Sequence, residues 1–161
     1  MDISFKDAYR KYSVNAYNIM AKPIGPVCNM NCTYCYYLEK KNLYESVQNF
    51  KMPDEVLESF IKQYIETQKA PVITFVWQGG EPSLLGIDFF RKVVALQQKY
   101  KGNKTIENSF QTNGTKLDDE WCKFLAEQEF LVGVSIDGPK WLHDKYRRYR
   151  NGQGTFHDIM Q

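Results

Sequence analysis

Three of the four cysteines in this 161-residue chain lie close together, at Cys28, Cys32 and Cys35. Three residues separate the first pair and two separate the second, so one loop can bring all three thiols around a small inorganic group. Thiolates are soft ligands that favour zinc or iron–sulfur clusters. A structural zinc takes four protein ligands, and ordinary electron-transfer clusters also take four. Three thiolates without a neighbouring fourth therefore indicate a cluster with one iron left open for a substrate or cofactor.

The remaining candidate ligands, the two histidines and the fourth cysteine, are distant in the sequence. His143 and His157 lie near the C-terminal end, and Cys122 is predicted to lie on the apolar face of a helix. Pairing all four cysteines would need a disulfide inside the short cysteine segment, which a reducing cytosol disfavours. The residues alone leave three readings open: a catalytic cluster site, a non-catalytic module that recruits a fourth ligand for zinc or a cluster, and unligated cysteines in an inactive remnant.

The cysteine loop is one of four polar or glycine-rich turns that each follow an apolar, β-branched run. The runs predict strands, and the run before Gln78 is apolar enough for a strand buried on both faces. The predicted strands are residues 17–23, 72–77, 105–110 and 130–136. The turns after the second, third and fourth strands begin at Gln78, Gln111 and Asp137.

Helical patterns alternate with these strands. One helix is predicted to begin at Pro53, a second follows Pro82, a third begins near Asp118, and another opens at residues 155–160. The apolar positions expected to face the core are Val56, Phe60, Ile61, Tyr64 and Ile65 in the first helix, Phe89, Phe90, Val93, Val94 and Leu96 in the second, and Trp121, Cys122, Phe124 and Leu125 in the third. The alternation predicts an α/β fold with a parallel sheet and right-handed crossovers. Parallel strands place all four turns at one rim, where such folds build their sites.

Composition predicts one globular domain over residues 1–161. Hydrophobic residues make up 43% of the chain and charged residues 25%, which suits an ordinary folded protein. A net charge of +2 is far below the basic excess of a protein that binds nucleic acid. No run reaches the ~18 apolar residues of a membrane span. Charged residues also occupy the stretch where a signal peptide would be apolar, which predicts a cytoplasmic protein: Asp2, Lys6, Asp7, Arg10 and Lys11.

With Tyr34 just before its third cysteine, the cysteine loop resembles the signature loop of the radical S-adenosylmethionine (SAM) enzymes. The turn Gly79-Gly80-Glu81-Pro82 resembles the glycine-rich turn where backbone groups of that superfamily approach the methionine end of SAM. A narrower resemblance is to the anaerobic sulfatase-maturating enzymes. It is carried by KPIGPVCNMNCTYCYYLEK, VWQGGEPSL, QTNGTKLDDEWCKFL and SIDGPKWLHDKYR followed by GQGTF.

This resemblance implies a partial (βα)6 TIM-like barrel with about four βα units. It implies that the three cysteines hold a [4Fe-4S] cluster whose open iron is chelated by SAM. One electron then cleaves SAM to methionine and a 5′-deoxyadenosyl radical, which removes a hydrogen from the β-carbon of a Cys or Ser in a sulfatase, and oxidation yields formylglycine. The residues implied to bind SAM are Tyr34, Gln78, Gly79, Gly80 and Glu81, together with Ser135 and Arg147 near its ribose and carboxylate.

The same resemblance implies partners and missing parts. The partners are a sulfatase polypeptide and an electron donor such as flavodoxin or ferredoxin. Relatives carry further strands, a domain with auxiliary clusters and an acidic catalytic residue, for which this sequence has no assignable positions. We therefore expect a fragment that keeps the cofactor site. A peptide maturase that forms a crosslink instead of an aldehyde is the alternative within the superfamily.

Overall fold

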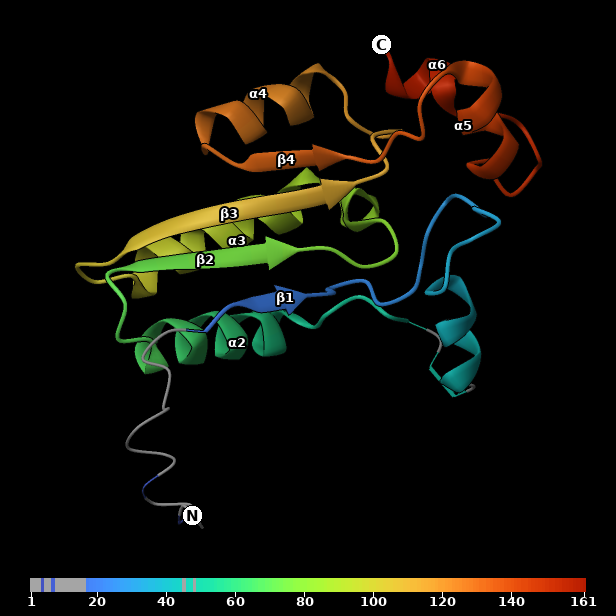
Figure 1. The fold of residues 1–161 in the computed structure, drawn as a ribbon. Coiled ribbons are helices and arrows are strands. Elements are labelled where there is room, and N and C mark those ends of the chain that lie inside the picture. Colours follow the sequence, from blue (N-terminus) through green and yellow to red (C-terminus); the bar gives the residue numbers. More distant parts are fainter. Residues whose placement is uncertain (1–3, 5–6, 8–16, 45, 48) are drawn as a thin grey trace.

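The computed structural model describes residues 4, 7, 17–44, 46–47 and 49–161. It contains a four-stranded parallel sheet in the order β1-β2-β3-β4 (Figure 1). The strands are β1 (Ile19–Ala21), β2 (Val72–Trp77), β3 (Thr105–Thr112) and β4 (Leu131–Val134). The α/β class and the parallel sheet are thus confirmed. The first and fourth strands are shorter than predicted and the third is longer. Most of the charged N-terminal stretch lies outside the described residues.

Alternate residues of the central strands divide the sheet into two faces, because successive side chains of a strand point in opposite directions. In β2, Ile73, Phe75 and Trp77 are buried, whereas Thr74 and Val76 on the other face are half-buried. In β3 the buried positions are the even-numbered ones from 108 to 112. The buried face is therefore the one that packs against helices.

Three helices cover that face (Figure 1): α2 (Asp54–Thr67), α3 (Ile87–Tyr100) and α4 (Asp119–Glu127). The side chain of Asp118 caps α4 by accepting a hydrogen bond from the Trp121 amide at 2.9 Å. One apolar core joins the helices to the sheet. Its main members are Leu57, Ile61, Tyr64 and Ile65 of α2, Phe75, Trp77 and Phe110 of the sheet, Phe89, Phe90 and Val93 of α3, and Trp121, Phe124 and Leu125 of α4.

Two predicted core positions are wrong. Val56 is 50% exposed, and Cys122 is exposed rather than on the apolar face of its helix. Val56 is next to the buried Leu57, and Cys122 is next to the buried Trp121. Neighbouring side chains on a helix point about 100° apart. Leu57 and Trp121 face the sheet, so their neighbours Val56 and Cys122 point outward.

Two short helices lie beyond the carboxyl ends of the strands, beside the cysteine loop (Figure 1). They are α5 (Lys140–Tyr146) and α6 (Phe156–Ile159), and α6 confirms the helix predicted at residues 155–160. Two 3₁₀ segments, η1 (Leu38–Leu43) and η2 (Pro82–Leu85), follow the first two strands. No helix among the described residues has the length and apolar character to cross a bilayer.

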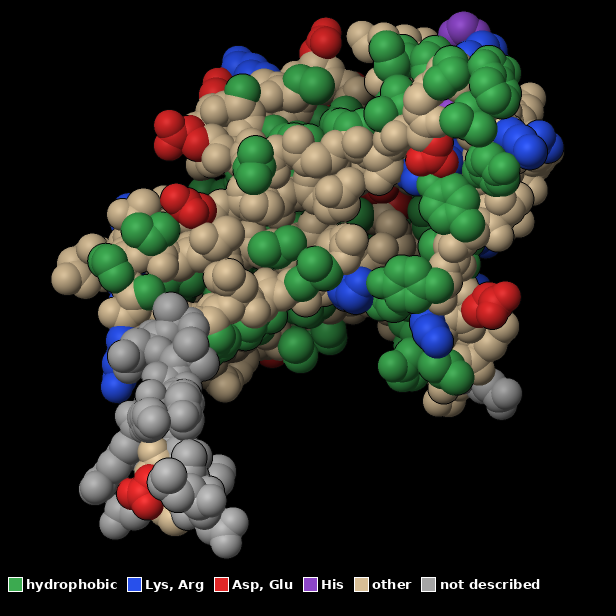
Figure 2. All heavy atoms as spheres, viewed as in Figure 1, with side chains coloured by type: hydrophobic (Ala, Val, Ile, Leu, Met, Phe, Trp, Pro, Cys, Tyr) green, Lys and Arg blue, Asp and Glu red, His purple; other side chains and the backbone are tan. Residues whose placement is uncertain are grey.

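The second face of the sheet carries no helix from the described part of the chain, and it faces the viewer in Figures 1 and 2. Hydrophobic side chains are scattered over this face in Figure 2. A hollow of about 330 Å³ crosses it, lined by Met20, Val76 and Leu131 among others. Helices on one face and an open second face are what a partial TIM-like barrel has, since the open face would form the inside of a closed barrel.

Candidate functional site

A cavity of about 240 Å³ lies at the carboxyl ends of the strands. It is lined by Lys22, Met30, Gln111 and Asn113, among others, together with nine of the ten residues that the sequence singled out. These nine are Cys28, Cys32, Tyr34, Cys35, Gln78, Gly79, Gly80, Ser135 and Arg147. Glu81, the tenth, does not line the cavity. Residues from four separate turns thus meet at one place, as parallel strands require.

The turn after β2 holds one end of the cysteine loop. The amide of Gly80 donates to the carbonyl of Gly25 at 2.7 Å, and the amide of Glu81 donates to the carbonyl of Val27 at 2.8 Å. A Cβ atom on Gly80 would lie 1.9 Å from the Val27 oxygen, so any larger residue would push the loop away. Gly80 is therefore required by contact with the chain's own backbone, a reason that the sequence did not reveal.

The other end of the cysteine loop is held by residues 146–154, which we call the strap. The Asn31 amide donates to the carbonyl of Arg148 at 2.8 Å, and the Thr33 amide donates to the carbonyl of Tyr146 at 3.0 Å. Met30, which is fully buried, forms an antiparallel bridge with Tyr149. The strap and the β2 turn together set the position of the three cysteines.

The three clustered cysteines are half-buried free thiols that line the cavity together. Cys28 Sγ is 3.4 Å from the Met30 amide and 3.7 Å from Asn113 Nδ2, both of which can donate to it. Burial raises the pKa of the Cys28 and Cys32 thiols, and the Arg147 guanidinium opposes the rise in the pKa of Cys32. A metal centre would deprotonate such thiols outright.

The donor set fits an iron–sulfur cluster better than a single ion. Within the described residues, no three Cys, His, Asp or Glu side chains converge closely enough to hold one metal ion. The thiols instead surround one side of a cavity, and three soft thiolate donors with N–H groups aimed at sulfur are typical of cluster sites.

Glu81 lies behind the cavity lining and hydrogen-bonds two residues that belong to it, Thr112 and Asn113. It is fully buried, and its carboxylate accepts hydrogen bonds from the amide of Ser83 at 3.0 Å, the hydroxyl of Thr112 at 2.7 Å and the amide of Asn113 at 2.6 Å. These bonds tie η2 to the end of β3. They also position Asn113, whose side-chain amide reaches Cys28. Glu81 thus acts on the cavity indirectly, through the Asn113 side chain that contacts Cys28.

Arg147 is buried although it belongs to a basic stretch with Lys145, Arg148 and Arg150. It is 9% exposed, whereas Lys145 and Arg148 are exposed. Its Nη1 donates to the hydroxyl of Tyr34 at 2.8 Å, and that hydroxyl donates to Asp137 Oδ2 at 2.6 Å. The buried Nε of Arg147 has no hydrogen-bond partner within the part of the chain described. Because Arg147 lines the cavity, its guanidinium lies where an anionic ligand group could bind.

Two further polar residues line the cavity: Lys22, which the sequence did not single out, and Gln111, which the sequence placed only at the start of a turn. Gln111 lines the cavity and its Nε2 donates to Ser135 Oγ at 3.1 Å. Lys22 Nζ is 3.3 Å from Gln78 Oε1 and 4.2 Å from the ring centre of Tyr37. Lys22 directly follows β1 and Gln78 directly follows β2. The predicted first strand extended to residue 23 and so included Lys22, and only the observed end of β1 at Ala21 places Lys22 at the rim.

Comparison with known proteins agrees with this geometry. Residues 23–161 match the family described as the radical SAM superfamily. A serine-type anaerobic sulfatase-maturating enzyme of Bacteroides thetaiotaomicron is 50% identical over 143 residues, which cover 89% of this chain and 34% of that protein. A cysteine-type anaerobic sulfatase-maturating enzyme of Clostridium novyi is 41% identical over 144 residues, covering 89% of this chain and 38% of that protein.

The fold is likewise similar to a solved structure. Native anSMEcpe with bound AdoMet and Kp18Cys peptide aligns with a TM-score of 0.78 at 42% identity, covering 89% of this chain and 38% of that one. The chain thus spans about a third of the length of the curated relatives it matches. With a family match over most of its residues and the cysteine loop in place at the strand ends, the chain belongs to the radical SAM superfamily.

Proposed function

We propose that this chain is the cofactor-binding part of an anaerobic sulfatase-maturating enzyme. Cys28, Cys32 and Cys35 would hold a [4Fe-4S] cluster, with SAM bound beside it in the same cavity. The observation that carries the proposal is that the three thiols share one cavity with Ser135 and Arg147 at the carboxyl ends of the strands. The identity to sulfatase-maturating enzymes supports the substrate class, a Cys or Ser of a sulfatase that becomes formylglycine.

The contacts of the residues around the cavity support specific roles in binding the cluster and SAM. The cluster and SAM together would supply a one-electron cleavage that yields a 5′-deoxyadenosyl radical. The Met30 amide and the Asn113 side chain would stabilise negative charge on the Cys28 sulfur, since hydrogen bonds to sulfur tune such centres. Arg147 would hold the SAM carboxylate through its planar fork, and Tyr34 and Asp137 would keep the fork in place.

The cleavage needs partners outside these residues. We propose a one-electron donor such as flavodoxin or ferredoxin, a sulfatase peptide as substrate, and a cytoplasmic location, because free thiols and a reduced cluster require reducing conditions. Residues 1–161 would form the core domain. The group that takes the substrate proton would lie in the part of the relatives that this chain does not match.

The test is anaerobic reconstitution of the chain with iron and sulfide, followed by an assay for 5′-deoxyadenosine after addition of SAM and a strong reductant. We expect about four iron and four sulfide per chain. Replacement of Cys32 by Ala should abolish both cluster uptake and SAM cleavage, because two thiolates are too few to retain the cluster. Cys122→Ala is the matched control, since Cys122 is exposed on α4 and does not line the cavity.

Two results would contradict the proposal. One is a wild-type chain that takes up zinc alone, which would indicate a metal-binding module. The other is a Cys32→Ala chain that still releases 5′-deoxyadenosine, which would show that Cys32 is not a ligand.

A further inference from the structure

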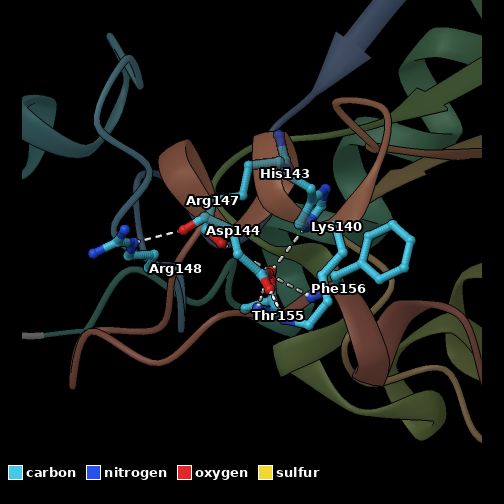
Figure 3. Close-up of polar contacts among 7 residues, drawn as sticks. All are labelled: Lys140, His143, Asp144, Arg147, Arg148, Thr155 and Phe156. Carbon is cyan, nitrogen blue, oxygen red and sulfur yellow. Dashed lines mark hydrogen bonds and ion pairs between the residues drawn. The ribbon is translucent and has the colours of Figure 1, made fainter.

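Two consecutive residues of α5, His143 and Asp144, both bind Thr155 at the start of α6 (Figure 3). His143 and Thr155 are fully buried, and none of the three residues lines the cavity. They belong to the sequence segments HDKYR and GQGTF, in which the proposed function gives a role to Arg147 but to none of these three residues. We call His143, Asp144 and Thr155 the latch.

The His143 ring joins two backbone groups on either side of it. The Asp137 amide donates to Nδ1 at 3.3 Å, so Nδ1 carries no proton in this arrangement. The proton is then on Nε2, which lies 3.0 Å from Thr155 Oγ1 and donates to it. The Thr155 hydroxyl in turn donates to the carbonyl of Arg147 at 3.1 Å. A neutral histidine thus connects the backbone of Asp137 to that of Arg147.

Asp144 binds the backbone amide of Thr155. Its carboxylate accepts hydrogen bonds from the amides of Thr155 at 2.9 Å and Phe156 at 3.0 Å, and from Lys140 (Figure 3). A Cβ on Gly154 would lie 2.3 Å from the carboxylate carbon, so the close approach requires glycine there. The start of α6 is therefore fixed against α5 at two atoms of Thr155.

These contacts fix the far end of the strap. The strap contacts the cysteine loop at Tyr146 and Arg148, and the latch holds it at Thr155, just past its last residue. Arg147 lies between Tyr146 and Arg148, the two residues that contact the cysteine loop. Its guanidinium and the Asp137 carboxylate meet at the Tyr34 hydroxyl on the cavity wall. The latch thus holds the main chain of both residues whose side chains meet there.

We propose that His143 is a positioning residue, which acts through Thr155 and the Asp137 amide to hold Arg147 in the geometry that binds SAM. The proposal rests on the proposed function, because it takes SAM as the ligand of the cavity. His143 does not reach the ligand itself, since it is fully buried and lies outside the cavity lining.

The test compares Thr155→Val with Thr155→Ser. Valine has the shape of threonine but removes the hydroxyl, leaving the Nε2–H group of His143 and the Arg147 carbonyl without their partner. Serine keeps the hydroxyl. On the chain without its cluster, hydrogen exchange of the amides of Asp137 and residues 146–149 should be faster in Thr155→Val and unchanged in Thr155→Ser.

On the reconstituted chain, SAM binding is measured by isothermal titration calorimetry alongside iron and sulfide content. We expect the SAM dissociation constant to rise about tenfold in Thr155→Val, an effect typical of a buried polar group left unpaired. It should stay within about twofold of wild type in Thr155→Ser. Iron and sulfide should be the same in all three chains, because the cysteines keep their own contacts.

Each remaining outcome overturns the proposal. Equal SAM affinity in Thr155→Val and wild type would show that the latch does not position Arg147. Loss of both iron content and SAM binding in Thr155→Val would show that the latch stabilises the whole site and does not position Arg147 specifically. A wild-type chain that loads with iron but binds no SAM would refute the proposed function. The first two results would refute only the role of His143 and would leave the proposed function unaffected.

Should Thr155→Val fail to fold, His143→Asn provides the same comparison. Asparagine keeps an acceptor for the Asp137 amide but is too short to donate to Thr155. The same tenfold loss of SAM affinity is expected from it, and wild-type affinity would overturn the proposal.

Discussion

At the scale of single residues, burial separates Arg147 from the basic residues around it. Arg147 is 9% exposed and contacts Tyr34, whereas Arg148 on the same strap is exposed. Both are arginines in one short basic run, so residue type and local charge do not distinguish them. The distinction comes from Tyr34 and Asp137, which are distant in the sequence.

Replacement of Arg147 by Lys should weaken SAM binding about tenfold, close to 1.4 kcal/mol. Lysine keeps the charge but loses the planar fork that can contact the Tyr34 hydroxyl and a carboxylate together. The measurement is calorimetric titration of the reconstituted chain with SAM. Arg91→Lys is the control, since Arg91 forms exposed ion pairs with Asp88 and Glu120 on the helix side. Similar affinities for the two variants would contradict a role of Arg147 in binding.

At the scale of elements, the turns after the strands and the strap form the site between them. The sequence predicted the turns, because apolar runs and glycine-rich segments are local patterns. It did not predict that residues 146–154 pair with the cysteine loop, because a backbone bridge such as Met30 to Tyr149 has no local signal. The glycine of the β2 turn shows the same limit, since the contact that requires it is with Val27.

The latch should make stability depend on pH. Burial lowers the pKa of His143, and the charge of Arg147 lowers it further, while Asp137 and Asp144 act in the opposite direction and Lys140 adds a smaller lowering effect. An unfolded histidine has a pKa of about 6.5, so below that pH the unfolded chain binds more protons than the folded one. The stability that this group contributes is complete above about pH 6.5 and is lost as the pH falls through the folded pKa.

We therefore expect the free energy of unfolding of wild type to fall between about pH 7 and pH 5, and to fall less in His143→Gln, which has no titrating ring. The measurement is urea unfolding at each pH. The second histidine, His157, is present in both chains, so the difference between the two slopes reports His143 alone. Identical slopes would show that the His143 ring is not held neutral.

At the scale of the whole molecule, the described helices cover one face of the sheet and leave the other open. Leu131 in the edge strand β4 is 72% exposed, and Val134 is 42% exposed. An exposed apolar edge is a template for pairing with another chain, and the hollow across the open face offers further apolar area. The core that joins the helices to the other face does not depend on what covers this one.

The isolated chain should therefore self-associate through β4, and Leu131→Lys should reduce that association, because lysine on an edge strand opposes pairing. Sedimentation velocity over a range of protein concentrations measures the effect. Leu43→Lys is the matched control, since Leu43 is 69% exposed but lies in η1, away from the sheet. Equal association in the two variants would show that β4 is not the contact surface.

The sequence by itself determined that three thiols lie in one loop, that strands alternate with helices, and that the motifs meet at one rim of the sheet. Each of these follows from contiguous residues: thiol spacing, apolar periodicity and turn chemistry. Only the tertiary structure decided that the Glu81 carboxylate binds Asn113, that Arg147 is buried, and that His143 contacts the strap through the Thr155 hydroxyl. Burial and hydrogen bonding of such side chains depend on residues that are far away in the sequence and become neighbours only when the sheet and its turns have assembled.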